Sequence, residues 1–321
     1  MASLSRKASA LFLVVAFIAC SGDDEKPSRI PVGAQPAEIL IPGAAVLIGA
    51  GDIGVCGSSG AEPTARIVDS VLRADSSAGT PTAVFTAGDN AYPSHITGTW
   101  RYFERCFADS WGKPRILAAI RPSPGNHDYD GGHGVYFDYF GVRAGPRGKG
   151  YYSYDLGSWH ILSLNSELYS GEGSAAEVRA QEQWLRDDLA AHRSQCSVAY
   201  FHRPLFSSGS YGSSPQSKNL WQILYSNGVD LVLNGHEHDY ERFLPQTPAG
   251  TADSVSGIEQ IIAGTGGGDL RRMQDAAAPN SAARIHGRFG VLKVALGAGE
   301  YAHAFIDTEG RIWDPGRRRC H

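Results

Sequence analysis

Short apolar segments that end in polar residues recur along this chain, and they constrain its fold more than any other feature. Five of them have the length and composition of buried β-strands: residues 44–50, 82–87, 116–120, 198–201 and 231–233. The polar groups that follow them are Gly51-Asp52-Ile53-Gly54, Gly88-Asp89-Asn90-Ala91-Tyr92, Gly125-Asn126-His127-Asp128, His202 and Gly235-His236-Glu237-His238. Amphipathic helices are predicted at 64–74 and 176–193, so we expect a layered α/β fold.

The later part of the chain is richer in strands. A hairpin is predicted within 151–165, around Gly157-Ser158. Further strands are predicted at 258–263, 290–296, 301–306 and 311–313. The sequence contains no internal repeat and no linker between 44 and 321, so we expect one domain there.

Polar residues at the carboxyl ends of strands in an α/β sheet converge on one crevice, where ligands bind. The residues expected to meet there are Asp52, Asp89, Tyr92, Asn126, His202, His236 and His238. Carboxylate, phenolate and amide oxygens, together with imidazole nitrogens, suit iron, manganese or zinc. Seven groups exceed the needs of one ion and fit two ions that share a carboxylate. Each group taken singly is more simply a turn, a surface histidine or a core tyrosine, but the ordered set favours a metal site.

This ordered set resembles the motifs of the purple acid phosphatases, a branch of the calcineurin-like metallophosphoesterase superfamily. Their motifs are D-x-G, G-D-x-x-Y, G-N-H-[DE], V-x-x-H and G-H-x-H, and this chain departs from them at Ala199, where valine is usual. The resemblance covers residues 44 to about 307. It implies a four-layer α/β/β/α sandwich in which two mixed sheets are flanked by helices.

The resemblance also implies a role for each ligand. The first metal, expected to be Fe(III), would be bound by Asp52, Tyr92 and His238. The second, expected to be Fe(II), Zn(II) or Mn(II), would be bound by Asn126, His202 and His236. Asp89 would bridge the two ions. Tyr92 distinguishes this branch, because most other metallophosphoesterases have a histidine in place of Gly54 and lack the tyrosine. A tyrosinate bound to Fe(III) would colour the protein purple.

The implied activity is that of a hydrolase acting on phosphate monoesters by attack of a metal-bound hydroxide. His127, next to Asn126, would orient the substrate and protonate the leaving group, or would only support the ligands by a hydrogen bond. His95 and His133 are candidates for substrate contact, although His95 is more simply part of a surface loop. The loop 207–217 is a candidate pocket wall. A phosphodiesterase or nucleotidase on the same metal core is the alternative, and a non-catalytic binding lipoprotein is a remote one.

Residues 1–19 have the features of an export signal, with a basic start and an apolar stretch too short to span a bilayer. Phe17-Ile18-Ala19-Cys20 resembles a bacterial lipobox, which implies cleavage before Cys20 and acylation of its thiol. An ordinary secretory signal or an uncleaved anchor is the alternative. Residues 20–43 would form a flexible tether and 44–321 the catalytic domain. We therefore expect an exported bacterial lipoprotein at the outer membrane, on its periplasmic face or at the cell surface.

The cysteines predict disulfides. If Cys20 is acylated, four others remain: Cys56, Cys106, Cys196 and Cys320. An even number in an oxidising compartment favours two disulfides, with three pairings open. We prefer Cys56–Cys106 and Cys196–Cys320, since the first two each follow a strand that carries a motif. A four-cysteine metal site is disfavoured, because the sequence contains no C-x₂-C pair.

The net charge of −4 argues against binding nucleic acid over a broad basic face. The expected partners are a small phosphate-ester substrate and, through the lipid anchor alone, a membrane.

Overall fold

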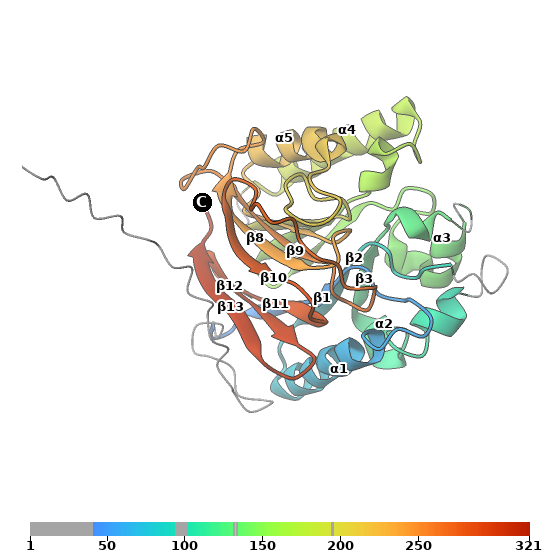
Figure 1. The fold of residues 1–321 in the computed structure, drawn as a ribbon. Coiled ribbons are helices and arrows are strands. Elements are labelled where there is room, and N and C mark those ends of the chain that lie inside the picture. The colour runs from blue at the N-terminus through green and yellow to red at the C-terminus, as the bar shows by residue number, and fades with distance from the viewer. Residues whose placement is uncertain (1–40, 94–101, 131, 133, 194–195) are drawn as a thin grey trace, which may run out of the picture.

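Four layers make up the fold: a helical layer, two β-sheets packed face to face, and a second helical layer (Figure 1). The structure is a computed structural model and describes residues 41–93, 102–130, 132, 134–193 and 196–321. Helices α1 and α2 cover the outer face of one sheet, and α4 and α5 cover the outer face of the other. The expected α/β/β/α sandwich with two mixed sheets is confirmed.

The first sheet has six strands within the described residues, in the order β13-β12-β11-β1-β2-β3. They are β1 (Ala45–Ala50), β2 (Thr82–Ala87), β3 (Ile120–Ser123), β11 (Gly290–Gly297), β12 (Glu300–Asp307) and β13 (Ile312–Arg319). Strands β1, β2 and β3 run parallel, whereas β11 pairs antiparallel with β1. Helices α1 (Ala61–Ala78), α2 (Pro114–Ala119) and α3 (Val135–Phe140) belong to this half of the molecule.

The second sheet has seven strands in the described part of the chain, in the order β10-β8-β9-β7-β6-β5-β4. They are β4 (Tyr152–Leu156), β5 (Trp159–Ser163), β6 (Ser197–Tyr200), β7 (Leu231–Asn234), β8 (Tyr240–Gln246), β9 (Ile258–Ala263) and β10 (Ser281–Ile285). Strands β5, β6, β7 and β9 run parallel. Helices α4 (Ala175–Ala191) and α5 (Lys218–Ser226) pack on this sheet.

Strand β1 illustrates why the apolar segments form buried strands. All of its residues are buried. Val46 and Ile48 pack on the α1 side of the sheet, whereas Ala45 and Leu47 pack between the two sheets. Because successive side chains point to opposite faces and both faces are covered, the strand is a continuous apolar run.

One predicted strand is wrong. Residues 116–119 belong to α2, and β3 begins directly after it at Ile120. Pro114 starts this helix, at a position where its missing N–H has no intrahelical partner to lose. A short apolar run fits either element, so its periodicity does not decide between them. Strands β8 and β10 escape prediction because charged residues such as Glu241 and Arg284 interrupt their apolar pattern.

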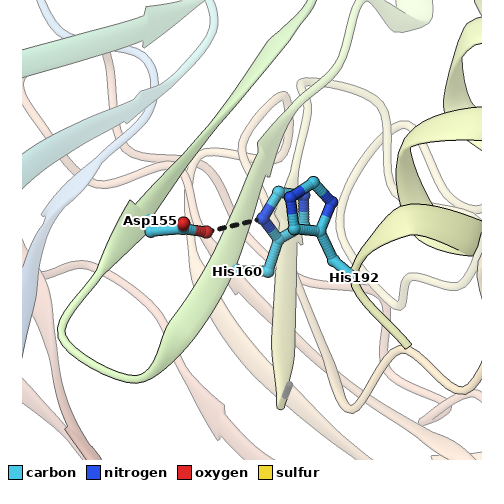
Figure 2. A group of neighbouring side chains, drawn as sticks. All are labelled: Asp155, His160 and His192. Carbon is cyan, nitrogen blue, oxygen red and sulfur yellow. Dashed lines mark hydrogen bonds and ion pairs between the residues drawn. The ribbon is translucent and has the colours of Figure 1, made fainter. Parts of the chain in front are cut away.

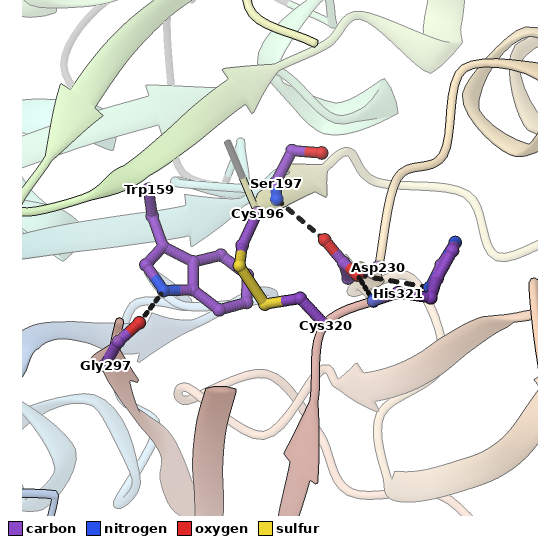
Figure 3. Close-up of a disulfide and its surroundings, with 7 residues drawn as sticks. All are labelled: Trp159, Cys196, Ser197, Asp230, Gly297, Cys320 and His321. Atoms are coloured by element: carbon purple, nitrogen blue, oxygen red, sulfur yellow. Dashed lines mark hydrogen bonds and ion pairs between the residues drawn. A yellow bond between two sulfur atoms is a disulfide. The ribbon is translucent and has the colours of Figure 1, made fainter. Parts of the chain in front are cut away.

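Both preferred disulfides are present. They join Cys56 to Cys106 and Cys196 to Cys320, with Cα–Cα distances of 4.5 and 5.7 Å. Figure 3 shows the second, which connects the residue before β6 to the residue after β13 and so links the two sheets. Beside it, Asp230 accepts a hydrogen bond of 2.9 Å from the backbone N–H of His321, which holds this residue beside the start of β7.

The predicted export signal, Cys20 and most of the tether lie outside the described residues, so these stay predictions. Strand β1 begins at Ala45, one residue after the predicted start of the catalytic domain. In the part of the chain that the structure describes, no helix combines the length and the apolar character needed to cross a membrane.

Candidate metal centre

The seven candidate ligands lie together where strands of both sheets end. From loops after β1, β2 and β3 come Asp52, Asp89, Tyr92 and Asn126, and from loops after β6 and β7 come His202, His236 and His238. The carboxyl ends of parallel strands in two different sheets thus build one site. Ligand atoms of Asp52, Asp89 and His202 lie within 4.8 Å of one another, and all three side chains are buried.

Asp52, Tyr92 and His238 form the first group of converging atoms. Tyr92 Oη lies 3.0 Å from Asp52 Oδ1 and 3.1 Å from His238 Nε2. His238 Nε2 is 3.2 Å from the same Asp52 oxygen. The other Asp52 oxygen accepts a 2.7 Å hydrogen bond from the backbone N–H of His236. This hydrogen bond fixes the carboxylate, so that Oδ1 faces the tyrosine and the histidine.

Asn126, His202 and His236 form the second group. His202 Nε2 lies 3.2 Å from Asn126 Oδ1 and 3.1 Å from His236 Nδ1. Asp89 lies between the two groups, because its Oδ2 is 3.3 Å from His202 Nε2 and its carboxylate also acts on the Tyr92 hydroxyl. Burial, followed by the charges of Asp52 and Asp89, raises the pKa of Tyr92 well above its ordinary value. Asp89 therefore stands where a bridging carboxylate would.

Backbone carbonyls orient two of the imidazoles. His202 Nδ1 lies 2.9 Å from the carbonyl oxygen of Ala87, and His238 Nδ1 lies 2.6 Å from that of Asp269. An Nδ1–H that donates to a carbonyl leaves the Nε2 lone pair directed into the site, as in many metal-binding histidines.

The backbone of the ligand loops adopts an unusual conformation. Asp52, Asp89 and His236 have φ angles of 59°, 48° and 72°, a region that non-glycine residues rarely enter. Such conformations concentrate at functional sites, where the surrounding structure holds them. Gly235 allows the close approach of these loops, because a Cβ there would lie 2.6 Å from Asp52 Oδ2.

The buried carboxylates of the site require a nearby positive charge. Burial, His202 and Arg203 lower the pKa of His236 to about 3, so its imidazole is neutral and can act as a ligand. Burial opposes a charge on His202, yet the carboxylates of Asp89 and Asp52 raise its pKa to about 10. A proton on His202 thus supplies positive charge that these buried carboxylates require, and bound metal ions would supply the same charge. The donor set and its electrostatics fit a dinuclear centre.

His127 lies at the edge of the site and lines an adjoining cavity of about 400 Å³. Its Nδ1 is 2.5 Å from Asp130 Oδ2, and its Nε2 is 4.0 Å from Asp89 Oδ2. The ring packs on Tyr92, with 4.5 Å between ring centroids. Its backbone N–H donates a 2.8 Å hydrogen bond to Asp89 Oδ1. The imidazole is therefore held beside the candidate ligands without belonging to either group. His95 and His133 lie outside the described residues.

Sequence reasoning missed Arg203 and Glu167. Arg203 Nε donates a 2.8 Å hydrogen bond to Glu167 Oε2, which is fully buried. The guanidinium also reaches Asn126 Oδ1 and His236 Nε2, both at 3.2 Å. The position of Arg203 directly after His202 is a signal that could have found it. Glu167 follows β5 outside every motif, so no local pattern marks it.

Sequence reasoning also missed Arg271, which lines the cavity together with Tyr211, Ser213 and Gln216. The predicted loop 207–217 therefore does form part of a pocket wall. Asp128, quoted within a motif but given no role, fastens two ligand loops: its Oδ2 accepts 2.8 and 2.9 Å hydrogen bonds from the Gly125 N–H and the Asn90 side chain.

Asp155, His160 and His192 also include residue types that bind metals, but their geometry is that of an ion-pair cluster (Figure 2). His160 Nδ1 lies 2.9 Å from Asp155 Oδ1, and its Nε2 lies 2.6 Å from Asp188 Oδ2. Its ring stacks on His192 at 3.8 Å with only 11° between the planes. Parallel stacked imidazoles cannot both direct in-plane lone pairs at one ion. Burial opposes a charge on His160, but the carboxylates of Asp188 and Asp155 raise its pKa, so the group is an ion-pair cluster around a buried histidine.

The comparisons with known proteins agree with this geometry. The model of the calcineurin-like phosphoesterase family matches residues 46–240. Human acid phosphatase type 7 is 27% identical over 281 residues, covering 76% of this chain and 62% of the human protein. Purple acid phosphatase 18 of Arabidopsis thaliana is 25% identical over 174 residues, covering 48% of this chain and 37% of that protein. The chain thus spans less than two thirds of either relative.

A purple acid phosphatase isolated from yellow lupin seeds shares the fold, with a TM-score of 0.67 and 18% identity over 87% of this chain and 55% of the lupin chain. The chain belongs to the calcineurin-like phosphoesterase family. Within that superfamily it is a purple acid phosphatase-like member. Its relatives imply a dinuclear metal centre, for which Asp52, Asp89 and His202 are candidate ligands.

Proposed function

We propose that this protein is a dimetal-dependent phosphatase that hydrolyses phosphate monoesters. The observation that carries the proposal is the pair of adjoining donor groups, with Asp89 between them and His127 beside them. In this proposal Asp52, Tyr92 and His238 hold Fe(III), and Asn126, His202 and His236 hold Fe(II), Zn(II) or Mn(II). Two bound ions supply Lewis-acid stabilisation of the phosphate charge and lower the pKa of a coordinated water.

In this proposal, other residues of the chain orient the metal ligands and donate a proton to the leaving group. His127 faces the cavity in which the ester would lie, and Asp130 holds its Nδ1. An imidazolium whose Nδ1–H is bound to a carboxylate presents its Nε2–H to the leaving-group oxygen, which is the geometry of a general acid. Arg203, anchored by Glu167, donates a hydrogen bond to Asn126 Oδ1 and keeps this side chain in place.

The test measures phosphate release from 4-nitrophenyl phosphate and from bis(4-nitrophenyl) phosphate, together with metal content and the visible spectrum. We expect two metal ions per chain, a visible tyrosinate band, and a higher kcat/KM for the monoester. Asp89→Asn should lose metal and activity, whereas Asp138→Asn, on the exposed surface, should retain both. A higher rate on the diester would instead favour a phosphodiesterase, and an empty site in gently purified protein would favour a binding protein.

His127 has its own test. His127→Ala should lower kcat most for esters with poor leaving groups and remove the basic limb of the pH–rate profile. A kcat that is unchanged at every pH would leave His127 with a supporting role alone.

We further propose that Cys20 carries the lipid that attaches the protein to a bacterial membrane. The support is the short apolar leader that ends at this cysteine. Mass spectrometry of the mature protein should find an acylated N-terminal cysteine, and Cys20→Ala should release the protein from the membrane fraction. An unmodified mature N-terminus would contradict the proposal.

A further inference from the structure

Arg271 lines the cavity beside the candidate metal centre. Its Nη1 atom is buried and has no hydrogen-bond partner among the described residues. Its Cζ lies 4.2 Å from the centroid of the Tyr211 ring, which holds the guanidinium by a cation–π contact. A buried guanidinium N–H without a partner is unfavourable, so such a group points to a ligand that would complete it.

Glu237 lies close enough for its charge to interact with that of Arg271, but it does not give Arg271 Nη1 a hydrogen-bond partner among the described residues. Its Oε2 instead accepts the backbone N–H of Tyr211 at 3.2 Å. The other cavity arginine, Arg203, differs because Glu167 binds its guanidinium at 2.8 Å. Of these two guanidinium groups in the cavity wall, Arg271 is therefore the one still able to bind an anion.

The place of Arg271 relative to the metal centre is set by two contacts. Its backbone N–H donates to the carbonyl oxygen of His238 at 3.3 Å. The Tyr211 ring stacks on His236, with 5.1 Å between centroids and 27° between planes. Arg271 and Tyr211 thus share one cavity with four candidate metal ligands, and a substrate whose phosphate is bound at the metal centre would extend along Arg271 and Tyr211. The cavity volume of about 400 Å³ is that of a small-molecule site.

We propose that Arg271, held by Tyr211, forms a second anion subsite that binds a negatively charged group on the leaving-group part of the substrate. The preferred substrates are then phosphate monoesters that carry a further carboxylate or phosphate. The proposal rests on the proposed phosphatase function, because it assigns the phosphate that is hydrolysed to the metal centre. A guanidinium binds either anion through paired, charge-assisted hydrogen bonds.

The test compares two substrates of similar size, glycerol 3-phosphate and 3-phosphoglycerate, which differ in a carboxylate. The measured quantity is the ratio of their kcat/KM values. The wild type should prefer 3-phosphoglycerate, and Arg271→Gln should lower the ratio by about 10- to 100-fold, the worth of a hydrogen bond to a charged group. Arg271→Lys should keep part of the preference. The matched control is Arg272→Gln, since Arg272 is exposed and adjacent in sequence, and it should keep the wild-type ratio.

Variants of Tyr211 separate loss of the anion subsite from a general loss of activity. Tyr211→Ala should lower the ratio by about 2- to 10-fold, because it removes the ring beneath the guanidinium, and Tyr211→Phe should preserve the ratio. A ratio that stays at the wild-type value in Arg271→Gln overturns the proposal, including the case in which both rates fall together.

Failure of the proposed function is distinguishable from failure of the subsite. If the wild type hydrolyses neither compound and also fails to hydrolyse 4-nitrophenyl phosphate, the phosphatase function fails. Calorimetric binding of the two compounds then decides on the subsite. Weaker binding of 3-phosphoglycerate to Arg271→Gln than to the wild type supports it, and equal binding overturns it.

Discussion

The pair of Glu167 and Arg203 offers a direct test of how burial controls the strength of an ion pair in this protein. Glu167 is fully buried and the Arg203 side chain is 20% exposed, with 2.8 Å between Oε2 and Nε. The exposed pair of Asp138 and Arg147 has nearly the same separation, 2.7 Å, but its side chains are 68% and 62% exposed. The two pairs therefore differ in environment far more than in geometry. The perturbations are Glu167→Gln and, as the matched control, Asp138→Asn.

The expected magnitudes follow from this difference. At 2.8 Å and an effective dielectric constant of about 20, the attraction of two unit charges is about 6 kcal/mol, and in water it is about a quarter of that. Desolvation of both groups offsets most of the buried attraction, but removal of one partner leaves the other buried and unpaired. We therefore expect Glu167→Gln to lower the free energy of unfolding by about 2–4 kcal/mol. Asp138→Asn should change it by less than about 1 kcal/mol.

The assay is equilibrium unfolding in denaturant at about pH 8. Burial raises the pKa of Glu167 above its ordinary value, against the charges of His202 and Arg203, so the assay is run well above the ordinary glutamate range to favour the carboxylate. Because Arg203 also contacts Asn126 and His236, metal affinity measured by chelator competition should fall about 10- to 100-fold in Glu167→Gln alone.

A double variant sharpens the test. Glu167→Gln combined with Arg203→Met leaves no unpaired charge and should be more stable than Glu167→Gln by itself. Equal losses in Glu167→Gln and Asp138→Asn, or a double variant less stable than the single one, would refute the reasoning.

Three further predictions concern the metal centre, the disulfide between the sheets and the histidine cluster. Tyr92→Phe should remove the visible absorbance of the iron-loaded protein, and an unchanged spectrum at equal iron content would show that Tyr92 is not the chromophore. The double variant Cys196→Ala, Cys320→Ala removes a disulfide between residues that are 124 positions apart. The loop-entropy relation then gives a loss of about 5 kcal/mol in the free energy of unfolding by denaturant. An unchanged free energy of unfolding would show that this disulfide does not constrain the denatured chain. Because the pKa of His160 is raised above 6.5, its ion pairs stabilise the fold fully at lower pH and progressively less as pH rises through the raised value. The destabilisation by His160→Gln should accordingly be largest near about pH 5.5 and shrink at alkaline pH, and a pH-independent difference would contradict this role.

The order of the motifs made the candidate ligands recognisable before the structure. Gly51-Asp52 and Gly88-Asp89 follow apolar runs, so their place at the carboxyl ends of strands could be deduced from pattern alone. Local pattern was insufficient for 116–120, because five apolar residues after a proline fit a short helix as well as a strand. It was also silent on Glu167, whose importance comes from a partner 36 residues away.

The sequence by itself determined the chemical character of the site. Two aspartates, a tyrosine, an asparagine and three histidines, each placed at the end of a buried segment, specify oxygen and nitrogen donors at the edge of a sheet. Only the tertiary structure decided how these donors are divided between the two groups of candidate ligands. The ligands come from two sheets that pack face to face, and only that packing brings Asp89 within 3.3 Å of His202. The same packing decided that Arg203 is bound to a carboxylate and that Arg271 Nη1 lacks a hydrogen-bond partner among the described residues, because burial and the distance to a partner depend on the packed structure and not on chain order.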